Sequence, residues 1–123
     1  MIIVDTNIIL RYLLNDNEKL NKVATNIMEN NDIFIPTEVI VETSYVLKKV
    51  YHVEKEKIYE VVKELLNFEN IHFQNSDTIK LAFKVYSERN FDIVDCLLYA
   101  YCKNENYVIV TLDEKLRKFI EGI

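Results

Sequence analysis

The stretch that decides the fold is Ile2-Ile3-Val4-Asp5-Thr6-Asn7, an apolar and β-branched run that ends on a carboxylate. Three further runs of the same apolar kind follow along the chain: Ile33-Phe34-Ile35, Ile71-His72-Phe73 and Tyr107-Val108-Ile109-Val110. Runs without polar alternation are typical of parallel strands that are covered on both faces. The sequence therefore predicts short parallel strands at these four places.

The segments between these runs have the length and the capping residues of helices. The predicted helices are 17–30, 37–51, 54–68, 77–89, 92–105 and 113–121, and several open on a capping residue, namely Thr37, Asp77, Asp92 and Asp113. Strands that alternate with helices are typical of a three-layer α/β domain. Ligands of such sheets bind beyond the carboxyl ends of the strands, so we expect the functional site there.

The composition predicts one folded domain, residues 1–123. The chain has one Gly and one Pro and therefore no sign of a linker, and half of its residues are hydrophobic, too many for a disordered protein. No apolar run approaches the about 20 residues of a membrane-spanning helix, and Asp5 interrupts the place where a signal peptide would be apolar. We therefore expect a cytoplasmic protein that does not contact the membrane.

The net charge of −5 disfavours a simple basic platform for nucleic acid. Bound cations can supply positive charge locally, and an acidic surface also suits a basic partner. Cys96 and Cys102 lie on one predicted helix, about 9 Å apart along its axis, which exceeds the about 7 Å reach of a disulfide. We expect free thiols, and the spacing of cysteine and histidine fits no zinc site.

Two aspartates follow predicted strands. Asp5 comes directly after the first strand, and Asp113 follows the last one after Thr111 and Leu112. Because neighbouring parallel strands lie about 4.8 Å apart and end at the same edge, these side chains can share a ligand if their strands are neighbours. The alternative is that each aspartate only caps the helix that follows it.

Glu42 lies on an apolar stripe of a predicted helix, three residues after Val39 and four before Val46. Burial of the Glu42 carboxylate without a partner would cost roughly several kcal/mol, and a bound cation would offset that cost. The alternative is a glutamate at the margin of the stripe that reaches solvent or a lysine.

Asp92 and Asp95 lie in the first turn of the predicted helix 92–105, on the same side. A helix N-terminus favours anions, so capping alone is one explanation of this spacing. Asp95 is followed by the apolar residues Cys96, Leu97 and Leu98, which predicts a carboxylate that faces inward at the sheet edge.

Mg²⁺ and Mn²⁺ prefer oxygen ligands. Four acids that converge on one place suit one or two such ions acting on a phosphodiester, and the candidates are Asp5, Glu42, Asp95 and Asp113. The sequence has no Gly-x-Ser-x-Gly motif, no Walker motif and no dinucleotide fingerprint. Metal-assisted hydrolysis is therefore the chemistry that this set of residues indicates.

Four motifs resemble, in order, the acidic motifs of PIN domains, and most closely those of the small VapC-like toxin nucleases. They are 3–11 (IVDTNIILR), 39–47 (VIVETSYVL), 91–98 (FDIVDCLL) and 110–115 (VTLDEK), and together they span nearly the whole chain. Cys96 stands where the family commonly has alanine, and Leu112 where an aromatic residue is frequent.

The resemblance implies an α/β/α sandwich around a central parallel sheet of four to five strands. It implies a Mg²⁺- or Mn²⁺-dependent endoribonuclease, a hydrolase in which a metal-activated water cuts RNA such as tRNA or rRNA. It also implies a homodimer and a cognate antitoxin protein. Carried onto this sequence, one or two ions would be held by Asp5, Glu42, Asp95 and Asp113, with Asp92, Thr6, Asn7 and Thr111 as accessory residues.

Other functions are compatible with the same residues. The chain could be a housekeeping RNA-processing PIN nuclease, or a non-catalytic PIN-like binding module in which the acids only cap helices. A third alternative is a phosphatase of the haloacid-dehalogenase kind, which also has an aspartate after its first strand. That chemistry needs a second aspartate two residues later, where this chain has Asn7. Basic residues that could contact RNA are Arg11, Lys48, Lys49, Arg89, Lys115 and Arg117, although most Lys and Arg on helices are solvated surface.

Overall fold

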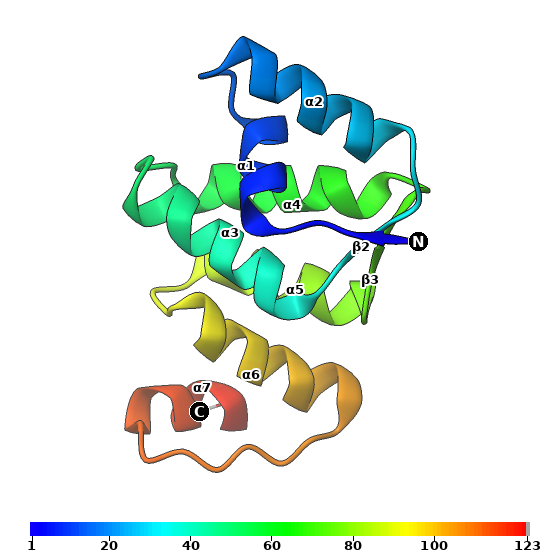
Figure 1. Cartoon of the computed structure of the whole chain (residues 1–123). Helices are drawn as coiled ribbons and strands as arrows, with labels where there is room; N and C mark the ends of the chain where they lie inside the picture. Colours follow the sequence, from blue (N-terminus) through cyan, green and yellow to red (C-terminus); the bar gives the residue numbers. More distant parts are fainter. Residues whose placement is uncertain (123) are drawn as a thin grey trace.

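The computed structural model describes residues 1–122, so Ile123, the last residue of the predicted domain, lies outside the described residues. Seven helices and three strands make up the described chain (Figure 1). In chain order they are β1 (Ile2–Ile3), α1 (Thr6–Leu13), α2 (Glu18–Glu29), β2 (Ile33–Ile35), α3 (Thr37–Lys49), α4 (Lys55–Asn67), β3 (Ile71–Phe73), α5 (Ser76–Glu88), α6 (Ile93–Glu105) and α7 (Glu114–Glu121).

The three strands form one parallel sheet in the order β1-β2-β3. Ile33 of β2 is at its centre, paired with Ile2 on one side and with Ile71 on the other. Ile33 and Ile35 are fully buried, which is why a run without polar residues occupies this position. The predicted α/β fold with a parallel sheet is therefore confirmed.

The predicted fourth strand, 107–110, does not join the sheet. In Figure 1 this segment runs between α6 and α7 along the lower edge of the molecule, with α6 between it and β1. Val108 and Val110 are 89% and 91% exposed. The segment is held there because α7 packs on α6, where the ring of Phe119 stacks on that of Tyr99 at 4.3 Å. Within residues 1–122 the sheet thus has three strands instead of the expected four to five.

Helix α1 was not predicted from the sequence. Its residues are apolar and partly β-branched, a composition that resembles a continuation of β1. The side chain of Asp5 accepts a hydrogen bond of 3.0 Å from the Ile8 amide and starts the helix, and Ile9 and Leu10 are buried. A cap and burial together therefore override the local strand preference.

The other helices match the predicted ranges within a residue or two, but two of the expected caps differ. Thr37 is the first residue of α3 and follows Pro36 at the cap position, and Asp77 lies inside the first turn of α5, which Asn75 caps. Asp113 caps α7 through a bond of 3.0 Å from the Leu116 amide. In the described chain, Asp92 occupies the cap position of α6 without a capping hydrogen bond from its side chain.

The core lies where α4, α5 and α6 pack together and against the strands. Phe83 of α5 is fully buried at its centre, beside buried residues such as Ile58 of α4 and Ala100 of α6. Both cysteines are free thiols, as predicted, with Cys96 buried and Cys102 partly exposed. Among the helices of residues 1–122, none has the combination of length and apolarity needed to cross a membrane.

Candidate functional site

A cavity of about 860 Å³, here called the acidic cleft, opens mainly between α3 and α6. Four carboxylates and three lysines line it, together with aromatic and aliphatic side chains. The lining residues are Thr37, Glu38, Val41, Glu42, Tyr45, Lys48, Lys49, Lys55, Gln74, Tyr86, Asp92, Ile93, Val94, Asp95 and Tyr101. Acidic and basic groups thus face the same space.

A smaller cavity of about 340 Å³ extends the acidic cleft towards α7. Both cavities are lined by Asp92 and Asp95, and the smaller one adds Asp113 and Lys115. Three aspartates from the start of α6 and the start of α7 therefore gather here. Asp113 is brought to this place by the packing of α7, and the hydroxyl of Thr111 accepts a bond of 3.0 Å from its amide.

The electrostatic environment of Asp95 disfavours its ionised form. Burial raises the pKa of the Asp95 carboxyl, the negative charges of Asp92 and Asp113 raise it further, and Lys115 opposes them. A carboxylate whose ionised form is disfavoured by burial and by like charges is stabilised by a nearby cation. The predicted inward orientation of Asp95 agrees with its partial burial.

Lys55, at the first position of α4, supports this arrangement. Its ammonium donates hydrogen bonds to the carbonyl oxygens of Phe91 at 2.9 Å and Arg89 at 3.3 Å, and lies 4.4 Å from the centroid of the Tyr86 ring. The role of Lys55 was not predicted from the sequence, because its partners lie more than 30 residues away and helical spacing carries no sign of such a contact.

Glu42 lines the acidic cleft, but the expectation that it is buried was wrong, because its side chain is exposed. The buried residues of α3 are Ile40, Thr43, Ser44 and Leu47. The buried stripe is thus rotated away from Glu42, and no cost of burying a carboxylate arises there.

Asp5 is not among the residues that line the two cavities. Its carboxylate caps α1, and the next two residues, Thr6 and Asn7, form the first turn of that helix. Thr6 is buried, and its hydroxyl donates a bond of 3.5 Å to the Val39 carbonyl of α3. Of the predicted site residues, Glu42, Asp92, Asp95 and Asp113 meet around the joined cavities, whereas Asp5, Thr6 and Asn7 lie at α1.

The donor atoms at this site suit a hard divalent cation. Within residues 1–122, no group of three histidine, cysteine or acidic side chains is placed to hold a metal ion. Magnesium, however, is commonly bound through one or two carboxylates, with waters and substrate phosphates as its other ligands. Asp95 with Asp92 or Asp113 fits an ion bound in that way, and does not fit a cage made of protein ligands alone.

Three of the six basic residues that could contact RNA line the two cavities. Lys48, Lys49 and Lys115 line one or both cavities. Arg11 instead bonds Asp16 at 2.9 Å, and the guanidinium of Arg89 lies 5.0 Å from the ring centroid of Phe119. The cleft thus has its own positive groups near the aspartates, although the chain as a whole is acidic.

Comparison with known proteins identifies the family. A profile of the PIN domain matches residues 2–121. The VapC ribonuclease of Aquifex aeolicus (strain VF5) is 36% identical to this chain over 101 residues, which cover 79% of this chain and 75% of that protein. No solved structure matches the chain significantly. The resemblance stated on the four acidic motifs is thereby confirmed, and the chain belongs to the PIN domain family.

Proposed function

We propose that this protein is a metal-dependent endoribonuclease and the toxin of a toxin–antitoxin pair, with RNA such as tRNA or rRNA as its substrate. The observation that carries the proposal is the convergence of Asp92, Asp95 and Asp113 on a cleft that lysines also line. The similarity to a VapC ribonuclease over most of the chain supports the same assignment.

In this proposal Asp95 is the central ligand of Mg²⁺ or Mn²⁺, with Asp92 and Asp113 as its neighbours. A divalent ion bound there supplies Lewis-acid chemistry for the hydrolysis of a phosphodiester. Lys48 and Lys49 bind the phosphates that flank the scissile bond, because both residues line the same cleft and carry positive charge. Glu42, exposed on α3, lines the same cleft and would be available to the ion as a further ligand.

We also propose that Asp5 completes a quartet of metal ligands with Glu42, Asp95 and Asp113 when the ion and RNA are bound, with Thr6, Asn7 and Thr111 as accessory residues. Asp5 caps α1 in the free chain. Asp5→Asn keeps a capping side chain at this position, so it should abolish Mn²⁺-dependent cleavage and leave the fold intact. Full cleavage by Asp5→Asn would contradict this role.

The experiment that tests the enzyme is incubation of purified protein with total cellular RNA and Mn²⁺, followed by mapping of the cut ends. We expect internal cuts by the unmodified protein, and no cuts by Asp95→Asn or in excess chelator. Glu88→Gln, on the exposed end of α5, is the control that removes one charge away from the cleft. Full cleavage by Asp95→Asn, or in chelator, would contradict the proposal.

The toxin role makes a separate prediction. Expression of the protein should arrest growth. Co-expression of a small protein that is encoded beside it and has a basic segment should relieve the arrest, because the chain has a net charge of −5 and aspartates line its cleft. If expression is harmless, the result would favour a housekeeping RNA-processing nuclease instead.

An enzyme that acts on cellular RNA would work in the cytoplasm. We also expect the protein to sediment as a homodimer in analytical ultracentrifugation.

One observation favours the non-catalytic alternative. Asp5 and Asp113 both cap helices, and no three-ligand metal group occurs in residues 1–122. Calorimetric titration with Mn²⁺ separates the two functions, since a binding module whose acids only cap helices would give no saturable heat.

A further inference from the structure

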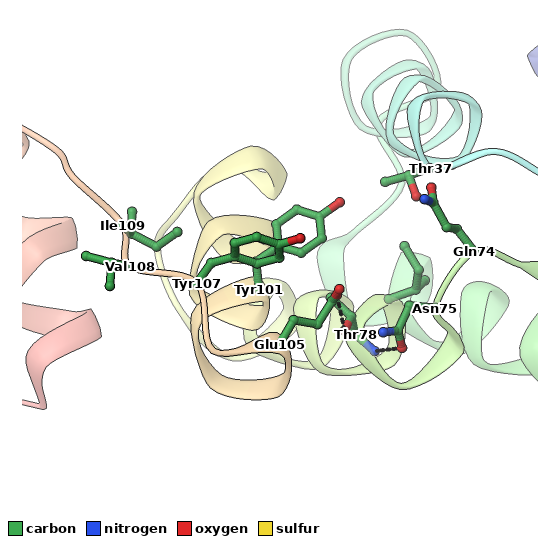
Figure 2. A pocket seen from close by; sticks show the side chains of 10 residues that line it. Thr37, Gln74, Asn75, Thr78, Tyr101, Glu105, Tyr107, Val108 and Ile109 are labelled. Carbon is green, nitrogen blue, oxygen red and sulfur yellow. Dashed lines mark hydrogen bonds between the residues drawn. The ribbon is translucent and has the colours of Figure 1, made fainter.

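A third cavity, of about 590 Å³, lies beside the acidic cleft and beyond the carboxyl ends of β2 and β3; we call it the side pocket (Figure 2). Thr37, Gln74 and Tyr101 line both the side pocket and the acidic cleft, so the two spaces adjoin. Its volume lies within the roughly 300–1,000 Å³ that is common for small-molecule sites. The pocket is therefore large enough for an aromatic ring.

The floor of the side pocket contains a fixed carboxylate. Thr78, which is 1% exposed, donates a hydrogen bond of 2.8 Å from its hydroxyl to Oε2 of Glu105. Figure 2 shows this bond and the Glu105 side chain reaching into the space in front of α5. Oε1 of Glu105 can accept hydrogen bonds from a ligand. Among the described residues that line the pocket, Glu105 alone is charged, so the pocket repels phosphate and favours a group with N–H donors.

Two tyrosines provide an aromatic wall. The rings of Tyr101 and Tyr107 lie 6.1 Å apart and nearly perpendicular, and Tyr107 is 59% exposed. Both tyrosines line the same pocket as Glu105, as Figure 2 shows. An exposed ring at the mouth of a cavity is a platform on which an unpaired nucleobase stacks.

The opposite wall is polar and uncharged. The side-chain oxygen of Asn75 accepts a hydrogen bond of 3.2 Å from the Thr78 amide. The amide nitrogen of Asn75 is therefore the half of the group that can donate to a ligand. Gln74, also on this wall, offers a second amide (Figure 2).

We propose that the side pocket binds an unpaired guanine base of the RNA whose backbone lies in the acidic cleft; this rests on the proposed ribonuclease function. Guanine presents N1–H and N2–H₂ side by side, which match the carboxylate of Glu105, and its O6 accepts from the amide of Asn75 or Gln74. The ring stacks on Tyr107. The negative phosphate stays outside, near Lys48 and Lys49. The site thus selects the base next to the cut.

The test measures binding without cleavage. Fluorescence anisotropy is recorded for Asp95→Asn protein, without divalent metal, and for short labelled uridine oligoribonucleotides with or without one central guanosine. We expect the guanosine to improve affinity about tenfold, the lower range of one stacked base. Glu105→Gln and Tyr107→Ala should each remove this preference. Tyr107→Phe, which keeps the ring, and Glu88→Gln, outside the pocket, should retain it.

Equal affinity for the two oligonucleotides would overturn the proposal, as would a guanosine preference that survives both Glu105→Gln and Tyr107→Ala. Guanosine monophosphate as competitor separates the sources of the base. Displacement at the affinity of the oligonucleotide itself would overturn the assignment to RNA and indicate a site for free nucleotide. Because no cleavage is measured, failure here is distinguishable from failure of the ribonuclease function, which the RNA-cutting experiment reports.

Discussion

The ammonium of Lys55 donates a hydrogen bond of 2.9 Å to the carbonyl oxygen of Phe91, the residue directly before Asp92. A second bond, to Arg89, fixes the same loop. The first residue of α4 therefore holds the chain that leads into α6, and the positions of Asp92 and Asp95 depend on this long-range contact.

Replacement of Lys55 by methionine keeps the apolar stem and removes both hydrogen bonds. We expect the free energy of unfolding to fall by about 2 kcal/mol, because bonds from a charged donor are lost, and RNA cleavage to fall as the loop before Asp92 loosens. Urea denaturation and cleavage assays measure the two effects. Lys57→Met, an exposed position on α4, should change neither. A Lys55→Met protein with unchanged stability and activity would contradict the positioning role.

Replacement of Asp95 by asparagine should separate activity from stability. Because burial and the charges of Asp92 and Asp113 raise the pKa of Asp95, its ionised form is disfavoured in the fold. We expect loss of cleavage with an unchanged or higher free energy of unfolding, by at most about 1 kcal/mol. Mn²⁺ should raise the Tm of the unmodified protein and not that of Asp95→Asn, since a ligand of the folded state stabilises it. Equal Tm shifts in both would contradict the assignment.

The hydroxyl of Tyr12 donates a bond of 3.0 Å to Glu29 and ties α1 to α2. Burial raises the pKa of Tyr12 to about 12, and the bond to Glu29 contributes to the shift. The folded state thus favours the neutral phenol, so its stabilisation is complete below the ordinary pKa of 10 and is lost as the pH rises through about 12. The stability difference between the unmodified protein and Tyr12→Phe should therefore shrink over that range in urea denaturation. Tyr45→Phe, at an exposed tyrosine, serves as control, and a difference that persists at the high end would contradict this account.

The two thiols should react very differently. Cys96 is fully buried, and burial raises the pKa of its thiol to about 12, whereas Cys102 is partly exposed. A thiol reagent should therefore label Cys102 in the native protein and reach Cys96 only after unfolding. Mass spectrometry of labelled peptides identifies the modified residue. Labelling of Cys96 at the rate of Cys102 would show that the α6 core opens readily.

The sequence predicted the elements that its local chemistry determines. The strands around Ile33 and Ile71 are recognisable because they are short apolar runs whose end residues are buried, and most helices because their apolar periodicity and turn residues agree. Helix α1 was missed because its residues have the composition of a strand and only the Asp5 cap starts a helix there. The segment 107–110 has a strand composition too, yet the packing of Phe119 keeps it on α6.

The part of the site that local sequence determines was predictable, and the part that depends on tertiary packing was not. The gathering of Asp92, Asp95 and Asp113 agrees with their positions at helix starts, which motif spacing reveals. The exposure of Glu42 depends on the rotation of α3, and the side pocket depends on Glu105 meeting Thr78 across 27 residues. Contacts of this kind arise from tertiary packing, and local periodicity does not encode them.

The central claim is that Asp95 holds a divalent cation in the acidic cleft, and an anomalous-difference map from crystals grown with Mn²⁺ tests it most directly. We predict a manganese peak at the Asp95 carboxylate, with Asp92 or Asp113 as a further ligand. A map with no peak in the acidic cleft at saturating Mn²⁺, or with the ion bound elsewhere on the chain, would contradict the claim.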